Sequence, residues 1–588
     1  MPLGPKVLAL CLIGVAASAA TTVSAKSPPP GKDTVLNTLV TELTRSQKNL
    51  QKRGEEPLFY LSYRLNDGRW FQESASYGAL LEVSDPRDPV LGRSRQLDVS
   101  ARVGSPALDN THKVRGGFDF DLDRMFGSAS TLPIEDDPGA LQVGIWKATD
   151  RAYKNAVKQL IKVKGNRAVK VEEDDRADDF SKEKPHTDVA AEVNIELDRA
   201  LWKDRLKRLS ALFKAHPRIL NSSINLQGGT TNQYFVDTEG TRLRQSHFFA
   251  RVMLWGTVKA DDGMDLELYD DLEASTVDAL PTDQQLTDRV ASLINRLEAL
   301  RTAPVVEPYS GPAIMTNRAA AVFFHEIFGH RVEGHRNKDA DEGHTFTKRL
   351  NQGVVPDFIS VTDDPTRQRY GTVPLNGYYT YDDEGVPAQK VALVDHGVLK
   401  AFLLGRSPIT GFPHSNGHGR AQPGLPPVAR QGNLLVESSK QVPYDQLRRE
   451  LIDEVKRQKK PYGLVFQDIS GGFTNTRTGG NPQAFKILPL VVMRVYADGR
   501  PDELVRGVDV VGTPLASFER IMATGDDFAV FNGYCGAESG FVPVSAIAPS
   551  ILIRDIEVER KEVNQDKLPL LAAPPLVPKR PVTAEVSR

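Results

Sequence analysis

The feature that most constrains the fold is a short apolar segment that ends in two histidines. Residues 319–324 are all apolar, and they lead directly into His325-Glu326, with a second histidine at His330. Such a run favours a buried helix, where an imidazole or a carboxylate is costly unless a partner meets it. The histidines are five residues apart, which is about 140° of rotation on a regular helix. If both serve one site, the helix must open before His330, for example through a wide turn that Gly329 permits.

His325, Glu326 and His330 are the residue types of a catalytic zinc site. Zinc favours imidazole and thiolate ligands, and a catalytic site keeps one coordination position for water. A carboxylate beside the first ligand can take the proton from that water. The familiar helical zinc motif spaces its histidines by four residues, not five. A straight helix through His330 would therefore exclude the two-histidine assignment.

A third ligand has to come from elsewhere in the chain. The sequence contains two cysteines, Cys11 and Cys535. Cys11 lies in an N-terminal segment that we expect to be removed, which leaves Cys535 as a lone thiol. A thiolate with two imidazoles is a sound zinc set, whereas burial as a small apolar side chain is the alternative for Cys535. The competing ligands are the histidines His335, His344, His396, His414 and His418.

The N-terminus has the order of a secretory signal. Lys6 precedes an apolar stretch over residues 7–20, and small residues follow as far as Ala25. This order is typical of a cleaved signal peptide, with an uncleaved anchor as the alternative. We therefore expect residues 1–25 to be a signal peptide and the protein to be exported, to the periplasm or, alternatively, beyond it. We expect no stable membrane span later in the chain.

Length and charge exclude some classes of protein. A chain of 588 residues is too long for one ordinary domain. Its formal net charge is −2, and it has no basic stripe of the kind that binds a phosphate backbone. We therefore expect no nucleic-acid partner.

The first half of the chain mixes helical and strand-like patterns. Short strand patterns occur over residues 57–121 and 222–268, the latter with turn signals at Gly228-Gly229 and Glu239-Gly240. We interpret residues 26–305 as one α+β domain. Helical periodicity is found over residues 34–52, 138–163, 197–216 and 282–301.

The second half is rich in strands. A short strand at residues 312–315 precedes the histidine-bearing helix, which Asn317 is placed to cap. Later strands alternate with Gly-rich turns, including one at Gly471-Gly472. The pattern predicts a large β-rich catalytic domain over residues 306–562 that carries the metal-binding helix. Residues 563–588 are Pro-rich and polar, which is typical of a flexible tail.

Several separated motifs resemble one known family. Residues 324–334, Phe-His-Glu-Ile-Phe-Gly-His-Arg-Val-Glu-Gly, resemble the signature of the TldD/PmbA family of metallopeptidases in its TldD branch. Residues 416–420, the Gly-rich residues 471–479 and the Cys535-Gly536 block with residues 542–549 resemble further family motifs in the same order. The resemblance covers about residues 310–555.

This resemblance implies a fold, a metal and an activity. The expected fold is α+β, with an N-terminal α+β domain followed by a large β-rich catalytic domain. The expected activity is zinc-dependent hydrolysis of peptides or unfolded polypeptide segments. His325, His330 and Cys535 would bind one zinc per chain, and Glu326 would be catalytic. Members of the family dimerise, so a homodimer or a heterodimer with a PmbA-like chain is expected.

The sequence also departs from the family pattern. His335 replaces the usual aspartate after Glu333-Gly334, and Ala537 replaces the lysine after Cys535-Gly536. The metal ligands are intact, so the departures concern contacts with the substrate. The signal peptide would make this chain an exported variant.

Two groups are candidates for binding the substrate. His418 or Arg420 is a candidate donor to the tetrahedral intermediate, with a structural role in a turn as the alternative. Residues 434–436 are a candidate sheet edge for an added peptide strand, or else an ordinary core strand. Two rival functions stay open: a zinc hydrolase of a non-peptide or cell-wall amide, and an idle peptide-binding scaffold.

Overall fold

The structure is a computed structural model that describes most of the chain. The described residues are 33–53, 56–84, 92–113, 129–167, 175–193, 197–339, 342, 345–474, 476, 485–561, 571 and 574. The predicted signal peptide therefore lies outside them, as does nearly all of the predicted tail. Among the described residues, no helix is long and apolar enough to cross a membrane.

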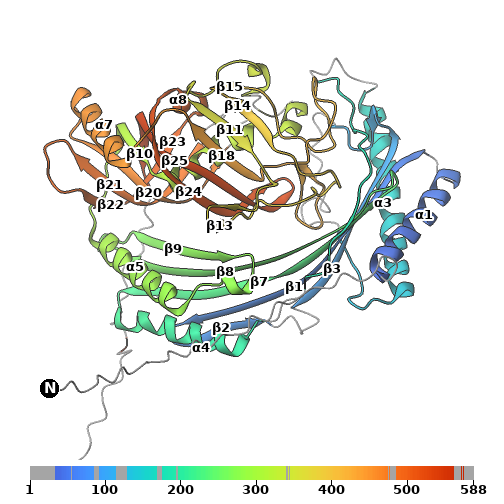
Figure 1. Ribbon diagram of the computed structural model, residues 1–588, viewed down its shortest axis with the longest axis horizontal. Coiled ribbons are helices and arrows are strands. Elements are labelled where there is room, and N and C mark those ends of the chain that lie inside the picture. Colours follow the sequence, from blue (N-terminus) through green and yellow to red (C-terminus); the bar gives the residue numbers. More distant parts are fainter. Residues whose placement is uncertain are drawn as a thin grey trace, which may run out of the picture.

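The N-terminal half is built around one long, curved sheet (Figure 1). Its central strands are long, and β1 pairs antiparallel with both β3 and β7, which in turn pairs with β8. Gly228-Gly229 lies inside β7, so the turn predicted there is wrong, whereas the turn at Glu239-Gly240 joins β7 to β8. The strands are β1 (Leu58–Ser76), β2 (Ala79–Ser84), β3 (Arg93–Ser105), β4 (Leu108–Asp109), β5 (Ser130–Thr131), β6 (Thr187–Val189), β7 (Ile219–Asp237), β8 (Arg242–Lys259) and β9 (Asp265–Ala274).

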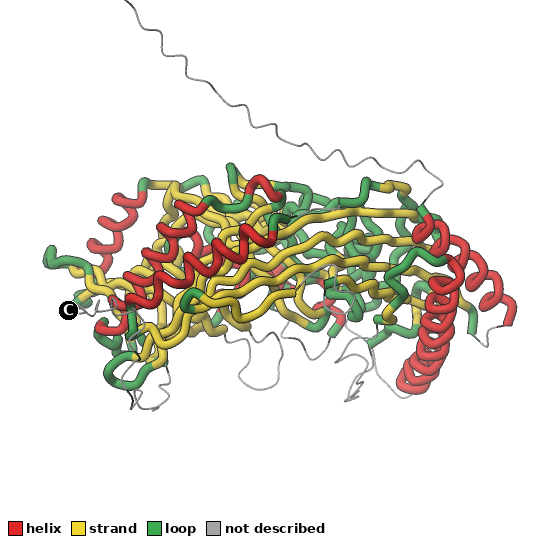
Figure 2. Tube along the Cα trace, turned by 90° about the horizontal axis from the view of Figure 1, so that it is seen from below, coloured by secondary structure: helices red, strands yellow, loops and turns green. Residues whose placement is uncertain are grey.

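Helices cover only the outer face of this sheet (Figure 2). Alternate residues of a strand point to opposite faces, so Leu61, Tyr63 and Leu65 of β1 pack into a core with the helices at one end. Phe71, further along the same strand, joins a second core with the helices at the other end. The second domain lies against the opposite face of the sheet. The helices are α1 (Thr34–Arg53), α3 (Pro138–Arg167), α4 (Arg199–Ser210) and α5 (Asp283–Thr302).

The C-terminal half contains a twelve-stranded sheet organised by one long strand, β25. β25 pairs with β10, β18, β23 and β24, so it holds together strands from the whole domain. β18 lies between β11 and β25, which makes residues 434–436 interior and excludes them as a sheet edge. The strands are β10 (Tyr309–Met315), β11 (Ile359–Asp363), β14 (Val391–Asp395), β15 (Val398–Leu399), β18 (Asn433–Ser438), β19 (Gln441–Val442), β20 (Tyr462–Thr474), β21 (Phe485–Tyr496), β22 (Glu503–Val505), β23 (Val508–Gly512), β24 (Ile521–Ala537) and β25 (Gly540–Arg560).

Two helices lie on opposite faces of this second sheet. α6 (Asn317–Ile327) packs in the main core, which also takes Ala313 and Met315 from β10. α7 (Tyr444–Arg457) packs with Ile314, the residue between them in the strand. Short elements complete the domain: α8 (Pro514–Glu519) and the two-stranded ribbons β12 (Arg369–Tyr370) with β13 (Val373–Pro374) and β16 (Gly419–Arg420) with β17 (Val428–Ala429).

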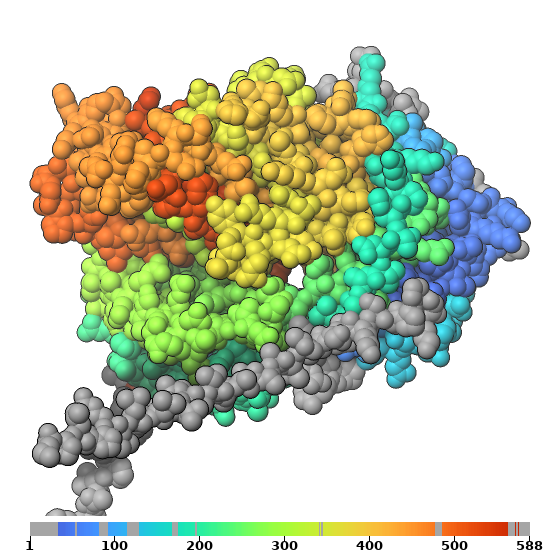
Figure 3. Space-filling view, in the orientation of Figure 1, coloured from blue at the N-terminus to red at the C-terminus, as the bar shows by residue number. Residues whose placement is uncertain are grey.

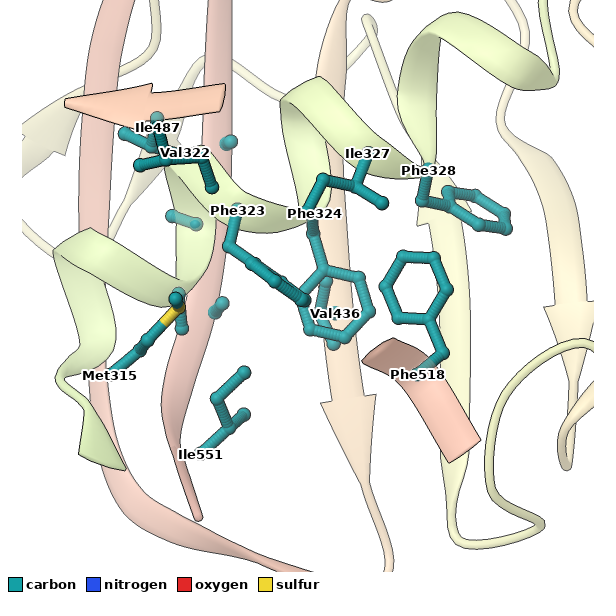
Figure 4. Close-up of a cluster of buried hydrophobic side chains, with 14 of the residues drawn as sticks. Met315, Val322, Phe323, Phe324, Ile327, Phe328, Val436, Ile487, Phe518 and Ile551 are labelled. Carbon is teal, nitrogen blue, oxygen red and sulfur yellow. The ribbon is translucent and has the colours of Figure 1, made fainter. Parts of the chain in front are cut away.

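Aromatic side chains fix α6 in the core (Figure 4). Phe323 and Phe324 both contact Phe518 of α8, with ring centroids 5.6 and 5.4 Å away. Phe328, just after the helix, also approaches this ring. Because these side chains are fully buried, the helix is held rigidly where its last turn presents His325.

Buried arginines join the two domains. Arg406 of the C-terminal half donates to Ser181 O at 2.7 Å and to Glu239 at 2.7 Å, and its guanidinium lies 4.0 Å from the centre of the Phe180 ring. Nη1 of Arg64 in β1 lies 3.2 Å from Oδ1 of Asp383 in the C-terminal half. Burying a charged group is costly unless an opposite charge or a hydrogen-bond partner meets it. These contacts therefore favour one arrangement of the two domains.

We predict that Phe324→Ala destabilises the protein by about 3–5 kcal/mol, because a fully buried ring is removed and a cavity is left. Leu201→Ala, at a half-exposed position of α4, is the control and should cost less than about 1 kcal/mol. The free energy of unfolding from denaturant titrations measures both. Equal losses for the two variants would contradict the role given to the aromatic cluster.

Candidate metal centre

The helix that carries His325 ends before the second histidine. α6 stops at Ile327, and a 3-10 turn over Gly329–Arg331 follows. The predicted opening of the helix is confirmed, although the turn is tighter than an α-helix and not wide. The rings of His325 and His330 lie with centroids 5.4 Å apart, so the five-residue spacing brings both to one place.

Gly329 has a different role from the one predicted. Its backbone is not among those with positive φ, so the turn does not require glycine for its conformation. A Cβ atom at this position would lie 1.9 Å from Oε1 of Gln431, and the Gln431 amide in turn donates to His325 O at 3.3 Å. Glycine is therefore needed for the close approach of Gln431.

Two further local predictions are wrong. Thr316, not Asn317, is the N-cap residue of α6, and the Asn317 side chain instead accepts from the backbone N–H of Arg318 and donates to Asp527. Cys535 does not lie in a turn but inside β24, opposite Val542 of β25. The strand gives Cys535 a fixed direction that a turn would not.

Three residues from distant parts of the chain converge on one point. Sγ of Cys535 is 3.3 Å from Nε2 of His330. The ligand atoms of His325, His330 and Cys535 all lie within 4.8 Å of one another, and all three side chains are buried. The structure therefore brings together the three residues that the sequence predicted as metal ligands.

The electrostatics of the cluster favour a thiolate. Burial opposes ionisation of Cys535, but His330 and His325 outweigh it and hold the pKa of the thiol well below its ordinary value. Burial likewise opposes protonation of His330, yet the Cys535 thiolate and Glu333 hold the pKa of His330 well above its ordinary value. The cluster is thus a thiolate that faces protonated histidine rings. The thiolate is the form in which cysteine binds a metal, and the two rings would release their protons when they bind one.

A buried carboxylate orients His330. Glu333 Oε2 lies 3.2 Å from His330 Nδ1, the nitrogen that faces away from the cysteine. Arg336 donates to the same oxygen at 2.8 Å. Burial alone would raise the pKa of Glu333, but His330 and Arg336 lower it to about 2, so the carboxylate is charged. A carboxylate behind a histidine fixes the ring and makes it a better metal ligand.

Arg430 connects this carboxylate to the strand that carries the thiol. Its Nε is 3.4 Å from Glu333 Oε1, and its Nη2 donates to Cys535 O at 2.6 Å. The guanidinium also donates to Ser539 Oγ, at the end of the same hairpin. Arg430 and Gln431 had no signal in the sequence, whereas Glu333 stands three residues after His330 in the motif.

The donor set fits a metal ion. Ligands at about 2.1 and 2.3 Å from a tetrahedral zinc ion lie about 3.5 Å apart, close to the 3.3 Å between His330 and Cys535. Nδ1 of His325 is buried and has no hydrogen-bond partner in the structure as described. An unpartnered buried nitrogen is costly unless another group meets it, and a cation shared by the three ligands would also separate the thiolate from the imidazoles.

Glu326 lies beside the cluster, not in it. A Cβ atom on Gly472 of β20 would be 3.0 Å from Cγ of Glu326, so the glutamate stem lies against this strand. Within the described part of the chain, no group donates a hydrogen bond to its half-exposed carboxylate. The oxygens are therefore available to a water or to a leaving group.

The structure does not bring His418 or Arg420 into the cluster. His418 is fully buried, with Nε2 3.2 Å from Asp363 and Nδ1 2.9 Å from Asn416 O. Arg420 donates to Gln431 O at 2.7 Å and lies over the ring of Tyr379. Both groups are engaged inside the protein.

The other candidate histidines that the structure describes are also apart from the cluster. His335 pairs with Glu538 at the tip of the hairpin. His396 and His414 are exposed. His344 lies outside the described residues. None of the described rivals takes the place of Cys535 in the cluster.

Known proteins resemble this chain in its second half and in its fold. Residues 308–560 match the model of the PmbA/TldA metallopeptidase C-terminal domain. A protein of Archaeoglobus fulgidus named metalloprotease is 31% identical over 245 residues, which are 41% of this chain and 51% of that protein. A zinc metalloprotease TldD homolog of Saccharolobus solfataricus is 24% identical over 286 residues, 48% of this chain and 58% of its own length.

A solved structure extends the likeness to the N-terminal half. TldE from Thermococcus kodakarensis superposes with a TM-score of 0.55 at 12% identity, covering 87% of this chain and 100% of its own. The predicted α+β fold is thereby confirmed. The sequence matches span only about half of these two relatives, and they support a place for the C-terminal domain among the PmbA/TldD metallopeptidases.

We predict that Glu333→Gln weakens zinc binding by about 10- to 100-fold, because the neutral amide no longer orients and polarises His330. Competition with a chromophoric chelator measures the affinity. The matched control is Glu454→Gln, which neutralises a glutamate of α7 that is also buried and arginine-paired. An unchanged affinity in Glu333→Gln would contradict the orienting role.

Proposed function

We propose that the protein is a zinc-dependent metallopeptidase that hydrolyses peptides or unfolded polypeptide segments. The observation that carries the proposal is the buried convergence of His325, His330 and Cys535 with a free carboxylate, Glu326, beside them. The relatives named metalloprotease and zinc metalloprotease support the same activity and metal. One zinc ion per chain follows from the single cluster of this kind among the described residues.

The three ligands would hold the ion and leave a position for water. Zinc bound there would supply a Lewis acid and a more acidic water. Glu326 acts as the general base, because its carboxylate is adjacent to the first ligand and is not held by another donor. It takes the proton from the attacking water and returns it to the leaving amine.

We predict that Glu326→Gln lowers peptide cleavage by at least about 100-fold while about one zinc per chain is kept, because only the proton acceptor is lost. Cys535→Ser should instead lose most of the zinc. Metal analysis of the purified proteins and cleavage of an unfolded protein and short peptides check both. Glu437→Gln, at an exposed position of β18, is the control for cleavage and should behave as wild type.

Several outcomes would count against the proposal. Full activity in Glu326→Gln would exclude the general-base role. Absence of metal from both wild type and Cys535→Ser would favour an idle peptide-binding protein. Cleavage of cell-wall fragments but not of peptides would favour hydrolysis of a different amide.

We further propose that the protein is exported and works as a dimer, with itself or with a PmbA-like chain. The proposals rest on the N-terminal pattern of Lys6 and residues 7–25 and on the family resemblance. The expected N-terminal residue of the protein recovered from the periplasm is Lys26, and N-terminal sequencing tests this. Recovery of the protein from the cytoplasm with Met1 retained would contradict export.

A further inference from the structure

A cavity of about 790 Å³ lies between the two domains. Its floor is the face of the N-terminal sheet that the helices leave uncovered, and its roof comes mainly from residues 374–383, 420–423 and 541–543. The space-filling view shows a small opening at this domain boundary, between segments coloured yellow and green (Figure 3). The three metal ligands and Glu326 do not line the cavity, so its function is a separate question.

The strand register arranges the floor in rows. Cross-strand partners point to the same face of a sheet. Asn66 of β1 is paired with Gln96 of β3 and with Gln233 of β7, which is paired with Gln245 of β8. All four side chains line the cavity and form a row of amides across four strands.

The next two rows differ in size and polarity. Two residues along the strands, Gly68 is paired with Ser94 and with Thr231, and Thr231 is paired with His247 of β8, so the second row is small on three strands and ends in an imidazole. The third row contains Trp70 and Phe249, which flank a glycine on β7. A Cβ atom on Gly68 would lie 2.6 Å from Nε1 of Trp70, so the indole ring folds over this glycine. The floor is thus a hollow between an amide row and an aromatic row.

Three aromatic side chains that line the cavity are left exposed. Trp70 is 43% exposed, Tyr534 45% and Phe541 66%. Exposed rings of this size gathered in one concavity are typical of a site that binds an apolar group. Phe249 and Tyr534 contact each other across the cavity with ring centroids 6.4 Å apart, so floor and roof both contribute.

The carboxylates Asp383 and Glu273 of the wall are already paired with arginines. Asp383 is 3.2 Å from Arg64, and Glu273 pairs with Arg251. Arg420 is held by the Gln431 carbonyl. A cationic ligand group would find these carboxylates occupied and would lose its hydration without compensation. In contrast, Nδ2 of Asn66 in the amide row has no hydrogen-bond partner among the described residues.

We propose that this cavity is a specificity subsite that binds an uncharged apolar or aromatic side chain of an extended peptide. The inference rests on the proposed peptidase function and deepens it. Tyr534 of the cavity wall directly precedes the ligand Cys535, and Val542 of the wall is its cross-strand partner, so the subsite and the metal cluster share one hairpin.

A peptide fits this wall better than a glycan does. The many hydroxyl groups of a glycan each need a hydrogen-bond partner when they are buried. The carboxylates that would serve them are paired with arginines, and two amides of the row, Gln233 and Gln245, are hydrogen-bonded to each other and to the protein. The exposed part of the wall is aromatic. An apolar side chain that enters the cavity needs no hydrogen-bond partner of its own.

The test compares two fluorescein-labelled Gly/Ser decapeptides that differ at one central position, Phe or Glu. Binding to full-length protein with Glu326→Gln, which is not expected to cleave them, is followed by fluorescence anisotropy. We expect the Phe peptide to bind at least about tenfold more tightly, since burial of one ring is worth that much. Trp70→Ala and Phe541→Ala, both at exposed positions, should abolish this preference. Trp146→Ala, an exposed tryptophan of α3 outside the cavity, should leave it unchanged.

Each alternative result has a distinct meaning. Equal affinity for the two peptides, or an unchanged preference in Trp70→Ala and Phe541→Ala, would overturn the subsite. Tighter binding of a labelled N-acetylglucosamine tetramer that Trp70→Ala removes would replace the peptide by a glycan. If the Phe peptide binds as expected but wild-type protein cleaves neither peptide, the proposed catalysis fails while the subsite stands.

Discussion

The arrangement of the candidate metal centre depends on the ion pairs and hydrogen bonds of one buried carboxylate, that of Glu333. A charge without solvent must be met by partners, and here His330, Arg336 and Arg430 meet it. Arg430 also binds the carbonyl of Cys535. One anion therefore links the turn after α6 to the strand that carries the thiol, and the positions of His330 and Cys535 depend on how this charge is neutralised.

The two histidines of the cluster are positioned in different ways, one by apolar packing and the other by a polar network. Phe323 and Phe324 fix α6 against Phe518, so the first histidine is set by packing. The second histidine lies beyond the end of the helix, where packing alone would leave a 3-10 turn free to shift. The hydrogen bond to Glu333 removes that freedom. A site held to within a fraction of an ångström needs both kinds of support.

The sequence predicted the parts of this structure that depend on local pattern. The five-residue spacing of His325 and His330 required the helix to open, and it does. Errors arose where distant segments decide the outcome: a partner strand turns Cys535 from a turn residue into a strand residue, and Gln431 explains Gly329. The amide row escaped notice because its members, such as Asn66, become neighbours only through strand register.

The hairpin of β24 and β25 has a consequence for how a protein with this fold can change over the course of evolution. Alternate residues of a strand face opposite ways, so Cys535 faces the metal ligands while Tyr534 faces the other domain. Substitutions of the residues that face the other domain, such as Tyr534, can alter which ligand the cavity binds without moving Cys535. A one-residue insertion would exchange the two sets and destroy both. Related proteins can therefore diverge in this hairpin by single substitutions, but not by insertions or deletions of one residue.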